Sequence, residues 1–354
     1  MGNRPVAQLP LIPTTVIGSY PQPSWLVDHA LLVKKGVPRT RAADVWRIPP
    51  TELEEALDAA TLLAIHDQAR AGIDIITDGE IRRESYFNHF ANALDGVDRE
   101  RLGEAVNRVG GRSMVPLVSG PIRRRAPVEL AAAEFLRAAT DRATKVTVPG
   151  PFTLSQLAQN EHYPDQRSLA LAYAEAIQEE LSELVTAGID VVQLDEPYLQ
   201  ANAAAARSFA VEAIDRALAG IGATTVLHTC YGYAVYVADK SGGYPFLAEL
   251  AECAADQLAI EFAQPRLDPT VLAPVAAKTI VLGVLDLSTK DVEPPNVIAD
   301  RLRAALEVVP PERLVAAPDC GMKFLTRPLA FAKLTALAEG AAQVRAEVGA
   351  SRGR

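Results

Sequence analysis

The sequence predicts an α/β fold of the (β/α)8 TIM-barrel class, formed as a single domain by residues 1–354. Three observations favour this class. Eight short apolar runs rich in β-branched residues recur along the chain, most are followed by a segment of helical periodicity, and no obvious break divides the series. Strands that are apolar on both faces form parallel sheets covered by helices, and eight such units in succession predict a closed barrel.

The predicted strands each end in polar residues, Gly or Pro. In chain order they are residues 14–19, 73–80, 145–151, 189–197, 224–230, 257–263, 279–286 and 313–320. Enzymes on this fold carry their chemistry at the carboxyl ends of the strands. Side chains at those ends are therefore the candidates for a functional site.

A helix is predicted in "PTELEEALDAATLLAIHDQARAG", residues 50–72. Thr51 is its expected N-cap, Glu54 completes a capping box, and Gly72 is the expected C-terminal stop. Residues from about 95 to 139 interrupt the alternation of strand and helix. We expect this segment to hold a hairpin inserted after the second βα unit, near the mouth of the barrel.

Composition excludes several classes of function. The net charge is -9 and the longest basic run is the three arginines at 123–125, so we expect no nucleic-acid partner. No apolar run is long enough to span a bilayer and the N-terminus lacks the pattern of a signal peptide, which predicts a cytoplasmic protein with no membrane contact. Three cysteines are too few for a disulfide framework, so a Cys beside other metal-type ligands is expected to be a thiolate ligand.

A zinc site is predicted at the strand ends. His228 and Cys230 lie two residues apart on one strand, which points both side chains to the same face. With Glu261 and Cys320 from two other strand ends, they supply the imidazole, thiolate and carboxylate donors that zinc binds in a tetrahedron. Taken singly, each has a structural alternative. Cys253 lies among apolar neighbours and is expected to pack in the core.

Acidic residues follow two other strands. Glu80 in "TDGEIRRESYF" and Asp195 in "QLDEP" could together accept hydrogen bonds from a substrate ammonium, although charged residues after a strand are often only a solvated loop. Ile17, Gly18 and Ser19 could place a backbone N–H and a hydroxyl around a carboxylate. These patterns suggest an amino-acid substrate.

These motifs resemble the catalytic domain of cobalamin-independent methionine synthase. "VIGSYP", "TDGEIRRESYF", "VPGPFTLSQLA", "QLDEP", "HTC", "AIEFAQ" and "APDCGMK" keep the family's order across residues 16–323. The resemblance implies a TIM barrel and a methyltransferase that methylates the thiol of homocysteine to form methionine. It implies zinc on His228, Cys230, Glu261 and Cys320, and amino-acid contacts at Ile17, Gly18, Ser19, Glu80 and Asp195.

The chain departs from the family in its folate site. Leu157 stands where the family places a Trp that stacks on the pterin of the donor, and Ala201 stands where it places a folate-binding Glu. Arg112 and Ser113 are candidates for what is left of that site. The length also leaves no room for the family's second, N-terminal barrel. A stand-alone core of this kind is expected to use a donor other than methyltetrahydrofolate, such as a corrinoid carrier.

Zinc would convert the substrate thiol to a thiolate near neutral pH. Glu261 is the ligand expected to yield to it, because a carboxylate is the hardest of the four donors. Asp286 and Asp319 are candidate catalytic residues, as proton acceptors or as groups that orient the ligands.

Three alternatives remain open. The related epoxyalkane:coenzyme M transferases alkylate a thiol that carries a sulfonate, for which Arg82, Arg83 or Arg112 would be needed in place of two carboxylates. A purely structural zinc in a binding protein would favour ligands clustered in short knuckles. A metal-free decarboxylase of porphyrin-like substrates would want a cationic pocket and gives the two thiols no role.

Overall fold

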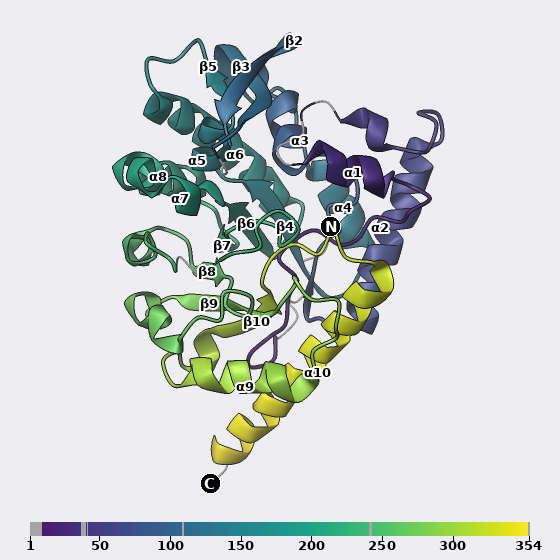
Figure 1. The fold of residues 1–354 in the computed structure, drawn as a ribbon, viewed down its shortest axis with the longest axis vertical. Helices are drawn as coiled ribbons and strands as arrows, with labels where there is room; N and C mark the ends of the chain where they lie inside the picture. The colour runs from purple at the N-terminus through teal and green to yellow at the C-terminus, as the bar shows by residue number, and fades with distance from the viewer. Residues whose placement is uncertain (1–8, 37–39, 41, 108–109, 241–242, 353–354) are drawn as a thin grey trace.

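The strands of the protein close into a parallel barrel. The computed structural model describes residues 9–36, 40, 42–107, 110–240 and 243–352. Seven strands pair in parallel in the order β1 (Ile75–Ile76), β4 (Ala143–Pro149), β6 (Val191–Asp195), β7 (Thr224–Thr229), β8 (Gln257–Ile260), β9 (Thr279–Leu285) and β10 (Leu314–Pro318). Thr14 bridges in parallel to Ala316 on β10, and Thr15 bridges to Ile75 on β1. The predicted eight strand segments and the TIM-barrel class are thereby confirmed (Figure 1).

Alternate side chains of the strands fill the interior of the barrel. A separate apolar cluster takes one or two members from each strand segment: Ile17, Ile75, Ala143, Val191, Val226, Ala259, Val281, Val315 and Ala317. Polar side chains follow two or four residues after these cluster residues, on the same faces of the strands. They include Lys145 on β4, Gln193 and Asp195 on β6, and His228 on β7. The interior therefore changes from apolar to polar toward the carboxyl ends of the strands.

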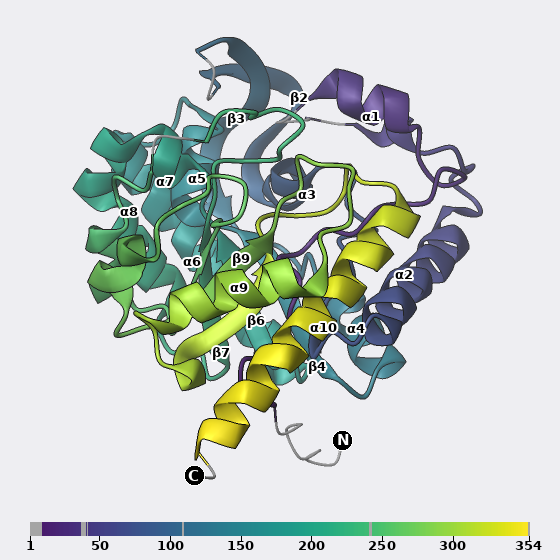
Figure 2. The same cartoon turned by 60° about the horizontal axis from the view of Figure 1, so that its bottom comes forward.

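Helices cover the outside of the barrel (Figures 1 and 2). They are α2 (Leu53–Arg70), α4 (Leu130–Ala139), α6 (Gln166–Thr186), α8 (Ala203–Leu218), α9 (Pro295–Leu306) and α10 (Arg327–Arg352). Shorter 3-10 helices, η2 (Ala248–Glu252) and η3 (Pro269–Val275), connect β7 to β8 and β8 to β9, and η1 (Ala43–Val45) and η4 (Pro311–Arg313) precede α2 and β10. Cys253 follows η2 and is buried in the core, as expected. No helix in the described part of the chain is long and apolar enough to cross a membrane.

The predicted capping box of α2 does not form. The N-cap position is Glu52, one residue later than predicted, and no side chain caps the helix there. The cause is the preceding turn, in which the N–H of Glu52 donates to the carbonyl of Pro49 at 3.0 Å. Gly72, with φ of 89°, follows the helix as predicted, because the chain leaves it in a left-handed conformation.

The segment in which an inserted hairpin was expected contains β2 (Asp95–Val106) and β3 (Arg112–Arg123), which pair antiparallel. The short β5 (Gln159–Asn160) joins β3 in parallel. Both views place β2 and β3 at the same end of the molecule as α1 (His29–Lys35) (Figures 1 and 2). Three further helices lie near this end: α3 (Tyr86–Ala93), α5 (Pro151–Gln156) and α7 (Tyr198–Ala201).

Candidate metal and substrate site

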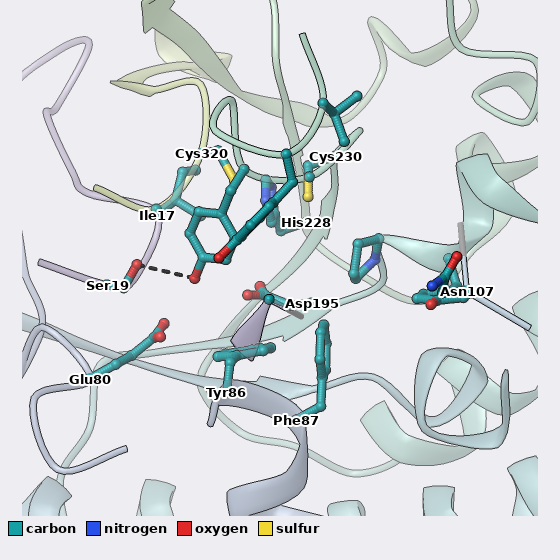
Figure 3. A pocket seen from close by; sticks show the side chains of 18 residues that line it. Ile17, Ser19, Glu80, Tyr86, Phe87, Asn107, Asp195, His228, Cys230 and Cys320 are labelled. Atoms are coloured by element: carbon teal, nitrogen blue, oxygen red, sulfur yellow. Dashed lines mark hydrogen bonds between the residues drawn. The ribbon is translucent and has the colours of Figure 1, made fainter. Parts of the chain in front are cut away.

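A cavity of about 270 Å³ opens at the carboxyl ends of the barrel strands. Its wall contains residues from the ends of five strand segments and from α3, α7 and the loop after β7 (Figure 3). The lining residues are Ile17, Ser19, Gly36, Glu80, Tyr86, Phe87, Asn107, Asp195, Pro197, Tyr198, His228, Cys230, Gly232, Tyr233, Tyr236, Val237, Cys320 and Gly321.

Three of the four predicted zinc ligands form one group in this wall. His228, Cys230 and Cys320 each offer a ligand atom, and these atoms lie within 4.8 Å of one another. All three residues are buried. His228 is the penultimate residue of β7, Cys230 follows that strand, and Cys320 follows β10, so the carboxyl ends of two strands bring them together.

The chemistry of this group fits a metal ion. One imidazole and two thiols are donors that zinc prefers, and the buried Nδ1 of His228 has no hydrogen-bond partner among the described residues. A hydrogen bond with Cys230, followed by burial, raises the pKa of the Cys320 thiol well above its usual value. Burial lowers the pKa of His228, but Cys230 and the nearby carboxylates outweigh it and raise that pKa to about 9. The group is thus a buried site in which a divalent cation would favour the thiolate form of Cys320 and the neutral form of His228.

Glu261, the fourth predicted ligand, lies beside this group with its carboxylate engaged elsewhere. It is fully buried, it accepts the backbone N–H of Tyr231 at 2.9 Å, and it forms an ion pair with the buried Nζ of Lys240. Burial raises the pKa of Glu261 to about 8, Lys240 opposes this shift, and Cys230 adds to it. Glu261 therefore has a charged partner already available next to the metal group.

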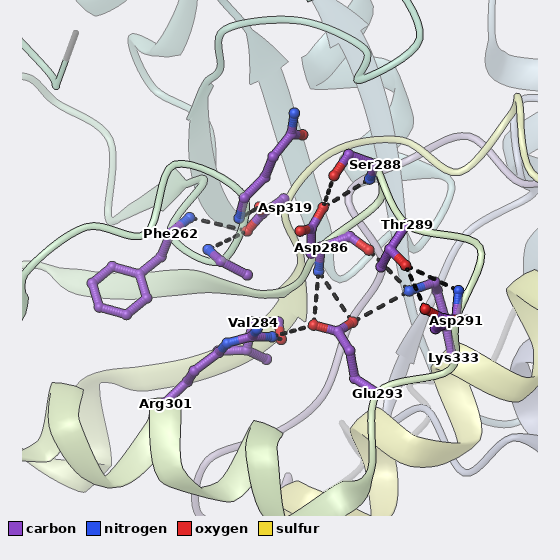
Figure 4. A network of polar contacts seen from close by, with 12 residues as sticks. Phe262, Val284, Asp286, Ser288, Thr289, Asp291, Glu293, Arg301, Asp319 and Lys333 are labelled. Atoms are coloured by element: carbon purple, nitrogen blue, oxygen red, sulfur yellow. Dashed lines mark hydrogen bonds and ion pairs between the residues drawn. The ribbon is translucent and has the colours of Figure 1, made fainter. Parts of the chain in front are cut away.

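The two predicted catalytic carboxylates are not among the lining residues. Asp319 accepts three backbone N–H groups of the loop after β8, from Phe262, Ala263 and Gln264, at 3.0, 2.9 and 2.6 Å. Because it stands between Glu261's loop and Cys320, it can orient both. Asp286 accepts the N–H and hydroxyl of Ser288 at 2.8 and 2.6 Å, in a separate network around Glu293 (Figure 4). A direct catalytic role for either stays a prediction.

Four of the five predicted amino-acid contacts fall at the cavity. Ile17, Ser19, Glu80 and Asp195 line it. Gly18 does not line it, but a Cβ there would stand 2.2 Å from Oε1 of Glu80, so glycine is needed for the carboxylate to lie where it does. Figure 3 shows Glu80 and Asp195 pointing into the same cavity as the His228 ring and the two sulfur atoms.

Glu80 is held in an unusual backbone conformation. Its φ is 53°, in the left-handed region that a non-glycine residue adopts only at an energetic cost. The hydroxyl of Thr147 donates to its Oε1 at 3.0 Å, while its buried Oε2 has no partner among the described residues. Burial raises the pKa of Glu80 to about 7, Arg83 opposes this, and Asp195 adds to it. A substrate cation would satisfy Oε2 and keep the carboxylate ionised.

The wall also contains aromatic residues that were not among the predicted site residues. Tyr86 and Phe87 begin α3, directly after the acidic loop, and Tyr233 and Tyr236 lie in the loop after β7. The hydroxyls of Ser19 and Tyr233 are 3.4 Å apart. The motifs "TDGEIRRESYF" and "HTCYGY" already contain Tyr86, Phe87 and Tyr233, and their adjacency to the acidic and metal residues was the available indication.

The three arginines that would favour a sulfonate substrate are committed to protein carboxylates. Arg82 pairs with Glu54 and Asp58, Arg83 with Glu129, and Arg112 with Glu104. None of the three lines the cavity. The described wall therefore offers two carboxylates and no guanidinium to a substrate.

A second, more polar hollow of about 600 Å³ lies next to the cavity and shares Asn107 and Tyr198 with it. Ala201 lines this hollow, together with the acidic Glu104 and Asp165. Leu157 lines neither space, because its side chain is buried in the hydrophobic core. The two positions that depart from the family's folate site thus present no aromatic face and no polar group.

Comparison with known proteins identifies close relatives across the whole barrel. The family described as "Cobalamin-independent synthase, Catalytic domain" matches residues 12–343. A methionine synthase of Saccharolobus solfataricus is 34% identical over 97% of this chain and 98% of its own, and one of Sulfurisphaera tokodaii is 34% identical over 96% and 95%. The structure of a B12-independent methionine synthase from a Shewanella species, in complex with selenomethionine, is 31% identical and covers 96% of this chain and 99% of its own, with a TM-score of 0.87.

Proposed function

The chain belongs to the cobalamin-independent methionine synthase family, and on this basis we propose that it is a zinc-dependent methyltransferase that converts homocysteine to methionine. The observation that carries the proposal is one cavity with two kinds of wall. His228, Cys230 and Cys320 form a metal-type group on one side, and Glu80 and Asp195 contribute carboxylates to the same space. Homocysteine carries a thiol and an ammonium, which match these two groups.

We propose that His228, Cys230, Glu261 and Cys320 hold the zinc. When bound there, zinc supplies the Lewis acidity that lowers the pKa of a thiol and makes its thiolate available as a nucleophile. The ion pair between Lys240 and Glu261 supports the idea that Glu261 is the ligand that the substrate thiol displaces. The buried ammonium of Lys240 is in place to pair with the carboxylate when it leaves the metal.

In the same cavity, Glu80 and Asp195 accept the substrate ammonium, while the segment containing Ile17 and Ser19 takes the carboxylate. The apolar faces of Tyr86 and Phe87 limit water around the reacting sulfur. The reaction then breaks the bond between the methyl group and its carrier and forms the sulfur–carbon bond of methionine. The bonding electron pair stays with the carrier, and the thiol proton passes to solvent before the attack.

The donor is proposed to be a methylated corrinoid carrier in place of methyltetrahydrofolate. Folates carry carboxylates, yet the described residues lining the cavity and the adjoining hollow include no Lys or Arg. Leu157 and Ala201 add no stacking face or polar contact. Exposed apolar side chains also occur on the elements near the mouth, with Val106 and Met114 on the hairpin 65% and 48% exposed. These apolar side chains suit a large donor that rests on the mouth of the cavity and presents only its methyl-bearing face.

Steady-state assays with homocysteine as acceptor test this proposal. We expect methylcobalamin to be used faster than methyltetrahydrofolate at matched concentration, since a folate bound here lacks a ring-stacking contact worth on the order of 1 kcal/mol. Coenzyme M serves as the control acceptor and should give no product, because its sulfonate meets two carboxylates. A faster rate with methyltetrahydrofolate would reject the donor, and methylation of coenzyme M in preference to homocysteine would reject the acceptor.

A further inference from the structure

Lys145 lies inside the barrel, below the cavity. It is on β4 between Ala143 and Thr147, which share its face, and it is 1% exposed. Its Nζ donates to Oε1 of Gln193 at 2.9 Å and to the carbonyl of Val16. Among the described residues it forms no salt bridge, so its charge is neutralised by no direct partner.

An ammonium in this position is not explained by stability. Burying a charge without a direct counter-ion is costly, and barrel interiors of this kind are normally filled by branched apolar side chains. The apolar layer just below Lys145, which includes Ala143 and Val191, shows that this barrel follows the usual pattern one layer down. Burial lowers the pKa of Lys145 to about 7, against the opposing effect of Asp195 and Glu80.

The contacts of Lys145 lead to both halves of the predicted amino-acid pocket. An ammonium can only donate, so it fixes the oxygen end of the Gln193 amide toward itself. The nitrogen end of that amide then donates to Oδ1 of Asp195 at 2.7 Å and to the carbonyl of Ile17 at 3.0 Å. The second bond of Lys145, to Val16, holds the segment that continues into Ile17 and Ser19.

We propose that Lys145 is a positioning residue for recognition of the amino-acid end of the substrate, acting through Gln193 on Asp195 and through Val16 on the segment 16–19. This inference rests on the proposed function. Beyond that function, selectivity for an amino group is assigned to Lys145, a side chain that does not line the cavity. The charged form of Lys145 also favours the ionised forms of Glu80 and Asp195, the two carboxylates that oppose the lowering of its own pKa.

The test compares Lys145→Met with Lys333→Met, a matched control. Lys333 is likewise a fully buried lysine, but it contacts Glu293 and the carbonyl of Asp286 outside the cavity. Calorimetry would measure the affinity of each zinc-loaded variant for methionine and for 4-(methylthio)butanoate, which lacks only the amino group. We expect Lys145→Met to reduce the preference for methionine by about tenfold, as expected for a disturbed charge-assisted contact. Lys333→Met should keep the wild-type preference.

Two further measurements separate positioning from folding. Zinc content should be unchanged in Lys145→Met, and its melting temperature should stay close to that of wild type, because removal of a buried charge offsets the loss of the hydrogen bonds to Val16 and Gln193. Gln193→Met, which keeps Lys145 but breaks the relay, should lose the preference to a similar extent and remains informative if Lys145→Met does not fold. Wild-type preference in either folded variant would overturn the inference. Equal binding of the two ligands by the wild type would instead reject the proposed amino-acid site.

Discussion

Replacing Cys320 with Ser is expected to lower the zinc content of the purified protein from about one ion per chain to a small fraction of that value, and to reduce methyl transfer at least about 100-fold. Cys320 is one of only three side chains in the metal-type group, and its sulfur lies within 4.8 Å of the ligand atoms of His228 and Cys230. A serine hydroxyl is a much poorer zinc ligand than a thiolate. Elemental analysis after dialysis would measure the effect.

Cys253→Ser is the matched control for this result. Cys253 is also buried, but it packs in the hydrophobic core after η2 and is no part of the metal-type group. Its replacement should lower stability by about 1 kcal/mol and leave zinc content intact. Retention of a full complement of zinc by Cys320→Ser, or equal loss in both variants, would contradict the assignment.

Glu80→Gln and Asp195→Asn are each expected to weaken methionine binding by about tenfold or more while zinc content is unchanged. Both carboxylates line the cavity, and Oε2 of Glu80 is a buried acceptor with no partner among the described residues. Methionine is the better probe because it has no thiol to titrate or to exchange at the metal. Binding is best followed by calorimetry at pH 8.

The pH dependence gives this prediction a sign. Burial raises the pKa of Glu80 to about 7, with Arg83 and Lys323 opposing and Asp195 and Asp78 adding to the shift. The wild type should therefore lose affinity for methionine as the pH falls through 7, because a protonated Glu80 no longer attracts an ammonium, and Glu80→Gln should lack that loss. Glu54→Gln, which removes a carboxylate that pairs with Arg82 outside the cavity, should behave as wild type. Unchanged affinity in both cavity variants would favour a substrate without an amino group.

Periodicity in the sequence was sufficient for the barrel because each strand carries its own apolar pattern. Thr14 and Thr15, whose bridges close the barrel, form one of the shortest strand segments, and both residues lie in a predicted apolar run. The start of α2 could not be located as well, since a turn at Pro49 moved the N-cap to Glu52. Local sequence thus predicts which segments form strands and helices but not the hydrogen bonds at their ends.

Predictability of the site depended on how local its geometry is. His228 and Cys230 followed from their spacing on one strand, and Cys320 from its place at a strand end. The engagement of Glu261 with Lys240 was not foreseeable, because Lys240 lies 21 residues earlier in an irregular loop. The role of Lys145 was not predicted either. A single lysine in the apolar run "KVTVPGP" gives no indication of which face of the strand it occupies or what it contacts.

We propose that a zinc ion in this cavity binds the sulfur of an amino-acid thiol. X-ray absorption at the zinc edge, recorded before and after addition of homocysteine, tests it most directly. We expect a zinc shell with two sulfur ligands, Cys230 and Cys320, that gains one further sulfur when homocysteine binds. A sulfur count that stays unchanged at a saturating concentration of homocysteine would show that the thiol does not bind the zinc.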